Sequence, residues 1–264
     1  MLIRGLTDLI HQTAIIAETA RVAENVTIGP YSVIGDHVSI DEGTVVGPHV
    51  VINGHTTIGK NNTFYQFSSI GEANQDKKYA GEPTRTIIGD NNVFRECCTV
   101  HRGTVQDDGI TKIGSHNLVM CYSHIAHDCK IGDRAILANN TTLAGHVHVG
   151  DWVILGGFTM VHQFVHVGSH AFSAINSILL KDIPPFVMAE GRPAVPRTIN
   201  SEGLSRRGFS KEAILAIRRA YKALYRQKLT LEEAMTSIGK MAEKHPELLT
   251  MTEFVEQSKR GIIR

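Results

Sequence analysis

The stretch from Ile113 to Val149 reads IGSHNLVMCYSHIAHDCKIGDRAILANNTTLAGHVHV and decides the fold. A large aliphatic residue stands at every sixth position of it, from Ile113 through Ile131 to Val149. A period of six matches neither the 3.6-residue period of a helix nor the two-residue alternation of an ordinary strand. It is typical of a parallel β-helix built from hexapeptide repeats, which is an all-β solenoid.

The same period extends in both directions from this stretch. Aliphatic or aromatic residues recur every six positions from Ile10 to Ile70, again from Ile88 to Val100, and on to Val167. We expect the first and fifth residues of each hexad to point inward, and three hexads to form one triangular coil of about eighteen residues. Residues eighteen positions apart should then lie above one another at about 4.8 Å, the spacing of paired strands.

Two insertions interrupt the repeat, at residues 72–86 and 103–112. Insertions in a repeat array are looped out, often on the binding face. After Ile178 the pattern fades into a proline-rich stretch. We therefore divide the chain into a solenoid of residues 1–190 and a helical domain of residues 191–264.

Capping signals predict three helices in the C-terminal domain. Ser210 caps a helix that runs to about Gln227, and Thr230 with Glu233 forms a capping box for a second. A third helix is predicted to open at Thr250, paired with Glu253.

The C-terminal domain is basic, although the whole chain has a net charge of only +1. From Glu190 onward there are 15 Lys and Arg against 9 Asp and Glu. Such a charge suits an acidic partner or a phosphorylated ligand, and a solvated helix face without a partner is the alternative. Nucleic acid is not expected as a partner, because aromatic residues are not interleaved with the charges.

Composition places the chain among soluble, disulfide-free proteins. No apolar run is long enough to form a transmembrane segment, and the first ten residues, with Arg4 and Asp8, do not form a secretory leader. We therefore expect a cytoplasmic protein. The four cysteines lack the CxxC spacing of a zinc ribbon or redox pair, and Cys98 and Cys129 fall on inward positions.

Histidines concentrate in the second half of the solenoid, and the repeat places some of them together. His127 is the third residue of its hexad, and adding one coil at a time gives Gly145 and then Gln163. These three residues should form one column on an outer face, with His124, His146 and His162 close by. A base, an unobstructed backbone amide and an amide side chain in one column indicate a site.

The chemistry available in this column is acyl transfer. His127 can deprotonate a hydroxyl, Asp128 can orient its imidazole, and the Gly145 N–H can bind a developing oxyanion. No Ser or Cys is plainly paired with a base, which favours direct attack by the acceptor. A zinc site, as in a γ-type carbonic anhydrase, is one alternative, and histidines that only fill exposed turns are another.

Several segments together resemble the UDP-N-acetylglucosamine 3-O-acyltransferase family. The similarity covers nearly the whole chain, including both interruptions and the helical tail. Hexapeptides alone would indicate only a large superfamily, whereas the other motifs are specific. These are NQD at 74–76, YAGEPTR at 79–85, HRGT at 101–104, HIAHDC at 124–129, LANN at 137–140, LAGHV at 143–147, VHQF at 161–164 and EGLSRRGF at 202–209.

The resemblance implies a left-handed parallel β-helix, a homotrimer and active sites between subunits. The left hand comes from the resemblance alone, because parallel crossovers are right-handed as a rule. The implied reaction moves a (R)-3-hydroxyacyl chain from acyl carrier protein to the 3-hydroxyl of UDP-N-acetylglucosamine, the first step of lipid A biosynthesis. It needs no cofactor and no metal. A coenzyme-A-dependent acetyltransferase of the same fold is the nearest rival.

The resemblance also assigns roles to individual residues. His127 would be the general base, Asp128 its partner and Gly145 the oxyanion donor. Substrate binding would fall to Asp76, Lys78, His124, His146, His162, Gln163, Asn200, Glu202 and Arg207. The basic residues Arg206, Arg207, Lys211 and Arg218 would receive the acidic carrier protein.

Ile175 departs from the pattern of the family. Long-chain members look to have glycine at the matching position, which forms part of the floor of the acyl groove. A β-branched residue there, with Phe172 nearby, predicts a donor of medium length.

Overall fold

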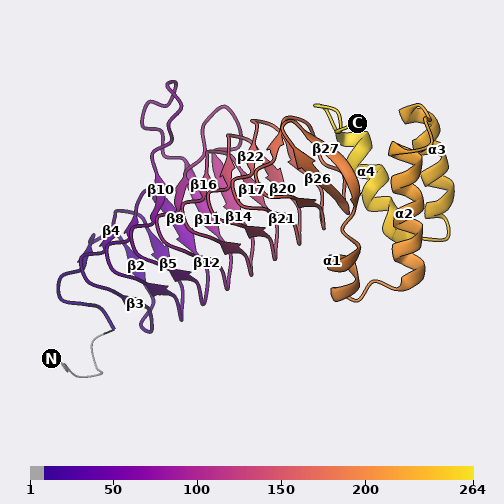
Figure 1. Ribbon diagram of the computed structural model, residues 1–264. Coiled ribbons are helices and arrows are strands. Elements are labelled where there is room, and N and C mark those ends of the chain that lie inside the picture. The colour runs from indigo at the N-terminus through magenta and orange to yellow at the C-terminus, as the bar shows by residue number, and fades with distance from the viewer. Residues whose placement is uncertain (1–8) are drawn as a thin grey trace.

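The computed structural model describes residues 9–264 and shows a solenoid with helices packed at its C-terminal end (Figure 1). Residues 1–8, which include most of the segment predicted not to be a secretory leader, lie outside this range. Among the described residues, no helix has the length and apolar character needed to cross a membrane.

Short strands stack into three parallel sheets, one along each side of a triangular prism. The nine-stranded sheet holds β1 (Ile15–Ile16), β4 (Val33–Ile34), β7 (Val51–Ile52), β10 (Ser69–Glu72), β13 (Thr99–His101), β16 (His124–Ile125), β19 (Thr142–Leu143), β22 (Met160–Val161) and β25 (Ile178–Leu179). The eight-stranded sheet holds β2 (Arg21–Val22), β5 (Ser39–Ile40), β8 (His55–Ile58), β11 (Arg85–Ile88), β14 (Ile110–Ile113), β17 (Lys130–Ile131), β20 (His148–Val149) and β23 (His166–Val167).

The ten-stranded sheet ends in an antiparallel hairpin rather than a further coil. It holds β3 (Thr27–Ile28), β6 (Val45–Val46), β9 (Thr63–Phe64), β12 (Val93–Phe94), β15 (Leu118–Val119), β18 (Ile136–Leu137), β21 (Ile154–Leu155), β24 (Phe172–Ser173), β26 (Val187–Gly191) and β27 (Ala194–Ile199). β26 and β27 pair with each other and close the sheet, so the 190/191 boundary used above falls inside this hairpin.

Register follows the repeat. Ile16 pairs with Ile34, eighteen residues on, whereas Ile70 pairs with Val100 and Phe94 with Val119, because the insertions lengthen those coils. Both loops, residues 73–84 and 102–109, leave the prism where the nine-stranded sheet turns into the eight-stranded sheet. We call this edge the first corner; the second leads from the eight- to the ten-stranded sheet, and the third from the ten- to the nine-stranded sheet.

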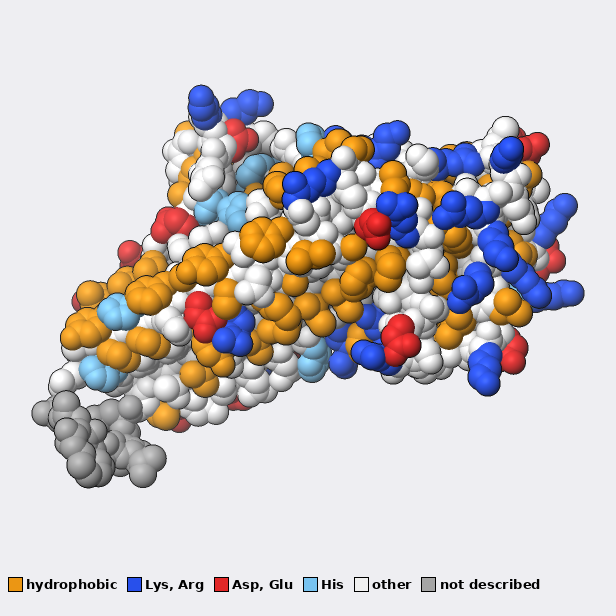
Figure 2. Space-filling view, in the orientation of Figure 1, with side chains coloured by type: hydrophobic (Ala, Val, Ile, Leu, Met, Phe, Trp, Pro, Cys, Tyr) orange, Lys and Arg blue, Asp and Glu red, His pale blue; other side chains and the backbone are white. Residues whose placement is uncertain are grey.

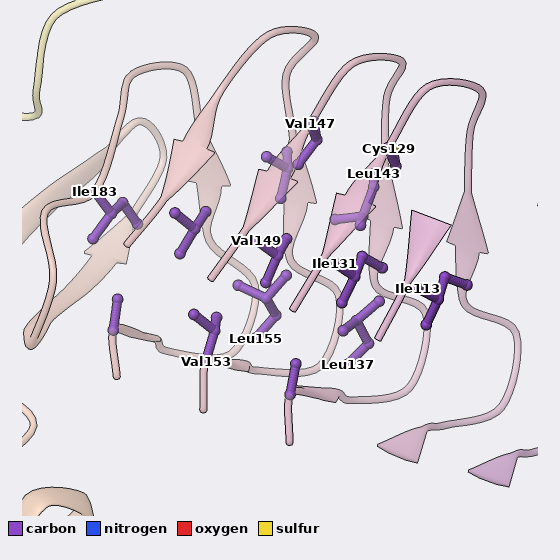
Figure 3. Packing of buried hydrophobic residues seen from close by; sticks show 14 of the residues in the cluster. Ile113, Cys129, Ile131, Leu137, Leu143, Val147, Val149, Val153, Leu155 and Ile183 are labelled. Atoms are coloured by element: carbon purple, nitrogen blue, oxygen red, sulfur yellow. The ribbon is translucent and has the colours of Figure 1, made fainter. Parts of the chain in front are cut away.

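The core is a set of inward columns, as the repeat predicts. First-position residues such as Ile113, Ile131 and Val149 stack in line, and fifth-position residues fill the corners beside them (Figure 3). Cys98 and Cys129 are fully buried in such fifth positions. Burying one aliphatic side chain contributes about 1.5–3 kcal/mol, so a ladder of this length stabilises the solenoid without disulfides.

Four α-helices follow the hairpin: α1 (Ser201–Arg206), α2 (Lys211–Tyr225), α3 (Leu231–Ala242) and α4 (Leu249–Gln257). Ser210 caps α2 and the Thr230–Glu233 capping box opens α3, as predicted. The prediction for the third helix was wrong at its start. A 3-10 turn at Pro246–Leu248 leads directly into α4, so Thr250 lies inside the helix and Leu248 occupies the cap.

Candidate active site

The site predicted from the sequence lies at the first corner, at the turns that follow β16, β19 and β22. Most hexad turns take their fourth residue into the left-handed region, with φ of 59° at Asp128 and 60° at His146. Backbone hydrogen bonds then join successive turns: the His146 N–H donates to the His127 carbonyl, and the Phe164 N–H donates to the Gly145 carbonyl. This stacking places His127, Gly145 and Gln163 in one column.

His127 and Asp128 form a hydrogen-bonded pair. Nδ1 of the His127 ring lies 2.8 Å from Oδ2 of Asp128, whose side chain is fully buried. Burial alone would raise the pKa of Asp128, but hydrogen bonds from His127 and Thr104 outweigh it and hold that pKa below its usual value. Because a carboxylate only accepts hydrogen bonds, Nδ1 of His127 carries a proton and Nε2 keeps a free lone pair.

Gly145 makes room for this ring. A Cβ at residue 145 would lie 2.6 Å from Nε2 of His127 and 3.0 Å from its Nδ1, so a side chain there would displace the imidazole. Among the described residues, the Gly145 N–H donates to no protein acceptor. Hydrogen bonding of this N–H to an oxyanion remains a prediction. The structure shows only that the absence of a side chain at Gly145 leaves space for the His127 ring.

His146 lies edge-on to His127, with ring centroids 5.1 Å apart, and stacks on Phe164. Its Nδ1 is 3.0 Å from a carboxylate oxygen of Asp107, and its Nε2 is 3.7 Å from Oδ2 of Asp128. The loop at residues 102–109 therefore reaches back to the site, which the sequence did not reveal.

On the other side of His127, His124 extends from β16. Its Nδ1 is 2.7 Å from the Thr99 hydroxyl, and its ring meets that of His101 edge-on. Burial, reinforced by the charges of His101 and His127, lowers the pKa of His124 to about 4. His124 is therefore a neutral hydrogen-bonding group at physiological pH rather than a second base.

A groove of about 470 Å³ runs from His146 and Phe164 toward the C-terminal segment. Lys259 and Arg260 line its far end. Arg260 donates from Nη2 to Nδ1 of His162 at 2.9 Å and from Nε to the Leu180 carbonyl at 2.7 Å. Arg260 is a further group that sequence reasoning missed, since nothing in the repeat links residue 260 to residue 162.

Asn200 and Arg207 lie at the second corner rather than the first. Asn200 caps α1 and donates to the His170 carbonyl. The Arg207 guanidinium stacks over Trp152 at 5.0 Å and lies 3.1 Å from Nδ1 of His170. Burial and then the Arg207 charge lower the pKa of His170 to about 4. Trp152 and His170 are eighteen residues apart, so the repeat could have identified this column.

The remaining predicted residues are spread over the surface. Asp76 and Lys78 occupy the loop at residues 73–84, which rises beside β10 in Figure 1, and Glu202 is exposed and paired with Arg206. Lys211 and Arg218 are exposed on α2, at the end of the molecule where Lys and Arg side chains gather in Figure 2. The chain alone therefore leaves Glu202, Lys211 and Arg218 at its helical end, whereas the loop of Asp76 and Lys78 leaves the prism at the first corner, as the turn of His127 does.

Phe172 and Ile175 belong to a different side of the prism. Phe172 points outward from β24 in the ten-stranded sheet and pairs in register with Ile154. Ile175 is 71% exposed at the third corner.

The metal alternative can be tested against the geometry. Donor atoms of His127, Asp128 and His146 lie within 4.8 Å of one another, close enough for a metal ion. However, Nδ1 of His127 already faces Asp128, Nδ1 of His146 faces Asp107, and both Asp128 oxygens accept from Thr104. An ion bound to the Asp128 carboxylate would have to compete with the Thr104 and His127 hydrogen bonds.

Comparison with known proteins gives matches over almost the full length. Residues 19–54 and 110–145 match the bacterial transferase hexapeptide (six repeats), and residues 182–263 match domain 2 of Udp N-acetylglucosamine O-acyltransferase. The acyl-[acyl-carrier-protein]--UDP-N-acetylglucosamine O-acyltransferase of Thiobacillus denitrificans is 60% identical over 255 residues, which cover 97% of this chain and 99% of that protein.

Solved structures agree with the left-handed β-helix. LpxA from Acinetobacter baumannii has a TM-score of 0.95 and 50% identity, covering 97% of this chain and 100% of its own. UDP-N-acetylglucosamine O-acyltransferase (LpxA) from Moraxella catarrhalis has the same TM-score at 46% identity and the same coverage. The predicted fold, including its handedness, is confirmed.

Proposed function

The chain belongs to the acyl-[acyl-carrier-protein]--UDP-N-acetylglucosamine O-acyltransferase family, and from that premise we propose its substrates and mechanism. It transfers a (R)-3-hydroxyacyl chain from acyl carrier protein to the 3-hydroxyl of UDP-N-acetylglucosamine, the first step of lipid A biosynthesis. The observation that carries this proposal is the His127–Asp128 pair, with its free Nε2 lying over Gly145. The two substrates also support a cytoplasmic location.

The reaction proceeds by direct attack on the thioester. Nε2 of His127 takes the proton from the sugar 3-hydroxyl as its oxygen bonds to the thioester carbonyl carbon. The Gly145 N–H donates to the resulting oxyanion. When the intermediate collapses, the C–S bond breaks, and the imidazolium returns its proton to the departing thiolate of the carrier protein. Asp128 stabilises the imidazolium between these steps and keeps its proton on Nδ1.

The complete site requires neighbouring copies of the chain. His127 lies at the first corner and Arg207 at the second, so one copy cannot offer both to the same sugar nucleotide. Exposed apolar side chains on the nine- and ten-stranded sheets and on the third corner support packing of copies there: Ile15, Tyr31, Val45, Phe67, Tyr122, Phe158 and Met160. The eight-stranded sheet instead presents Lys130, His148 and His166. A homotrimer joined along the apolar sides satisfies both observations.

In that assembly, the first corner of one copy meets the second corner of the next. Asp76, Lys78, His124, His146 and Gln163 then hold the sugar and the acyl headgroup, while His162, Asn200, Glu202 and Arg207 engage the nucleotide. Phe172 and Ile175 limit the acyl chain to medium length. No cofactor is needed, because the thioester already activates the acyl group, and chelation of metals should leave the rate unchanged.

A transfer assay with UDP-N-acetylglucosamine labelled in the sugar and 3-hydroxyacyl carrier proteins of several lengths tests the proposal. Acylated sugar nucleotide should form with the carrier-protein donors and not with acetyl-coenzyme A. Product formed with acetyl-coenzyme A and not with the carrier-protein donors would instead identify a coenzyme-A-dependent acetyltransferase. If the exposed Arg206, Lys211 and Arg218, with the half-buried Arg207, receive the carrier protein, kcat/KM should fall steeply with added salt, while the rate with acyl-phosphopantetheine should not.

A further inference from the structure

The loop at residues 102–109 is built onto the coil that carries the candidate base. Its first residues are fixed by backbone hydrogen bonds: the Arg102 N–H donates to the Glu72 carbonyl, and the Gly103 N–H donates to the Arg85 carbonyl. Gly103 lies so close to the other end of the loop, at Gly109 and Ile110, that no side chain fits there. These contacts direct the next residue, Thr104, inward.

Thr104 meets Asp128 with two donors. Its backbone N–H donates to Oδ1 at 2.8 Å, and its hydroxyl donates to Oδ2 at 2.6 Å. Oδ2 also accepts from Nδ1 of His127 at 2.8 Å. Thr104 is 1% exposed and the Asp128 side chain is fully buried, so water cannot replace either hydrogen bond if it is lost.

We propose that Thr104 is a positioning residue, which fixes the plane of the Asp128 carboxylate and thereby the orientation of the His127 imidazole. The inference rests on the proposed function of His127 as the base. A carboxylate held only by the imidazole can rotate about its Cβ–Cγ bond, whereas two donors from one residue, on different oxygens, fix that rotation. The insertion therefore supplies the third member of a Thr104–Asp128–His127 chain of hydrogen bonds.

The expected effect on the pH profile follows from the charges around the pair. Asp128 faces His127 and His146; His146 also faces Asp107, and the imidazoles of His101 and His124 adjoin His127 from the preceding coil and from β16. Loss of the Thr104 hydroxyl leaves Asp128 a stronger acceptor toward the imidazolium. The acid limb of kcat/KM, which reports the base in the free enzyme, should then move to higher pH.

The test compares Thr104→Val, Thr104→Ser and Thr111→Val in the full-length protein. Thr111 is the matched control: it is fully buried and its hydroxyl accepts from the Asp128 backbone N–H at 2.8 Å, but it does not touch the carboxylate. We expect Thr104→Val to lower kcat roughly tenfold with little change in KM, and to move the acid limb upward. Thr104→Ser should restore both, and Thr111→Val should leave the acid limb in place.

An unchanged profile and rate in a folded Thr104→Val protein would overturn the inference, as would an equal shift in Thr111→Val. If Thr104→Val does not fold, Thr104→Ala and Thr104→Ser are compared by the same profile. A double-mutant cycle adds a second criterion: in a protein that already carries Asp128→Asn, adding Thr104→Val should lower kcat little further. A different result would show that the proposed function itself is wrong: His127→Ala would then keep its activity, whatever the Thr104 variants show.

Discussion

Histidines occur at both ends of the first corner, and the two groups differ in what surrounds them. In the early coils, His37 and His55 stack face to face, with centroids 4.6 Å apart and planes 2° from parallel. In the later coils, His127 and His146 meet edge-on at 88°, on either side of the buried Asp128. The repeat is the same in both places, so the repeat alone does not make a base.

The difference lies in the carboxylate and in the loop that holds it. The pKa of His55 is lowered by burial, and the groups that add to this effect are His37, Arg102 and Arg85, all cationic when charged. Around His127, the Asp128 carboxylate accepts a hydrogen bond from the imidazole, and residues 102–109 contribute Thr104 and Asp107. One irregular loop thus distinguishes the histidine column that we propose to be reactive from a stacked one.

The strongest test of this difference removes one histidine from each group. His127→Ala should lower kcat by about 10²- to 10⁴-fold, the usual contribution of a positioned general base. His37→Ala should keep the wild-type rate, because the His37 ring stacks on His55 and pairs with no carboxylate among residues 9–264. Steady-state transfer kinetics measure both, and sedimentation checks that each variant keeps the native assembly. Comparable losses in the two variants would contradict the assignment.

Gly145→Ala tests the space that the later coils reserve for the imidazole. The new Cβ would lie within 3.0 Å of both ring nitrogens of His127, so the ring must shift from its present position. We expect kcat to fall about 10²-fold, since a displacement of about 1 Å at a reacting group has effects of this size. Gly239→Ala is the control, because a Cβ there meets nothing within 4 Å. A wild-type rate in Gly145→Ala would show that the ring has another position.

Acid should destabilise the later coils, where His124 has a pKa of about 4 against 6.5 for an ordinary histidine. Between these values the unfolded chain binds a proton that the folded chain does not, so the free energy of unfolding falls as pH falls from about 6.5 to about 4. The loss from this group is at most about 3 kcal/mol. Urea unfolding from pH 7 to pH 4 should therefore show a flatter pH dependence in His124→Asn than in wild type. If the free energy of unfolding depends on pH in the same way in both proteins, burial does not lower the pKa of His124.

Most of the fold could be predicted because it is periodic. From Val26 onward the first and fifth hexad positions are buried as expected, whereas Ile10 in the first coil is 41% exposed. The eighteen-residue register holds outside the insertions. α2 and α3 were found for the same reason, since a side-chain cap marks the start of each, whereas α1, capped by Asn200, was not predicted. The start of α4 was misplaced because a 3-10 turn, rather than a cap at Thr250, leads into it.

The candidate site was predictable only where it follows the repeat. His127, Gly145 and Gln163 share a column by arithmetic, and Asp128 adjoins the base in sequence. Thr104 and Asp107 were not predicted, although Thr104 ends the HRGT motif, because an aperiodic loop gives no register from which to place them. The link between Arg260 and His162 joins residues 98 positions apart, and only the folded chain shows it.

Ile175 lies on a different edge of the prism from His127. It is exposed at the third corner of the later coils, so it should change which donor is used and leave the chemical step intact. Each methylene that cannot be buried costs about 0.8 kcal/mol, or roughly fourfold in selectivity. Ile175→Gly should therefore move the optimum of kcat/KM to longer 3-hydroxyacyl donors, by that factor for each added methylene, while Ile175→Val keeps the wild-type profile. Competition between carrier proteins that bear donors of different length measures the ratio directly. An unchanged profile in Ile175→Gly would remove Ile175 from the floor of the groove and leave Phe172, on the strand β24 that directly precedes it, as the residue to substitute next.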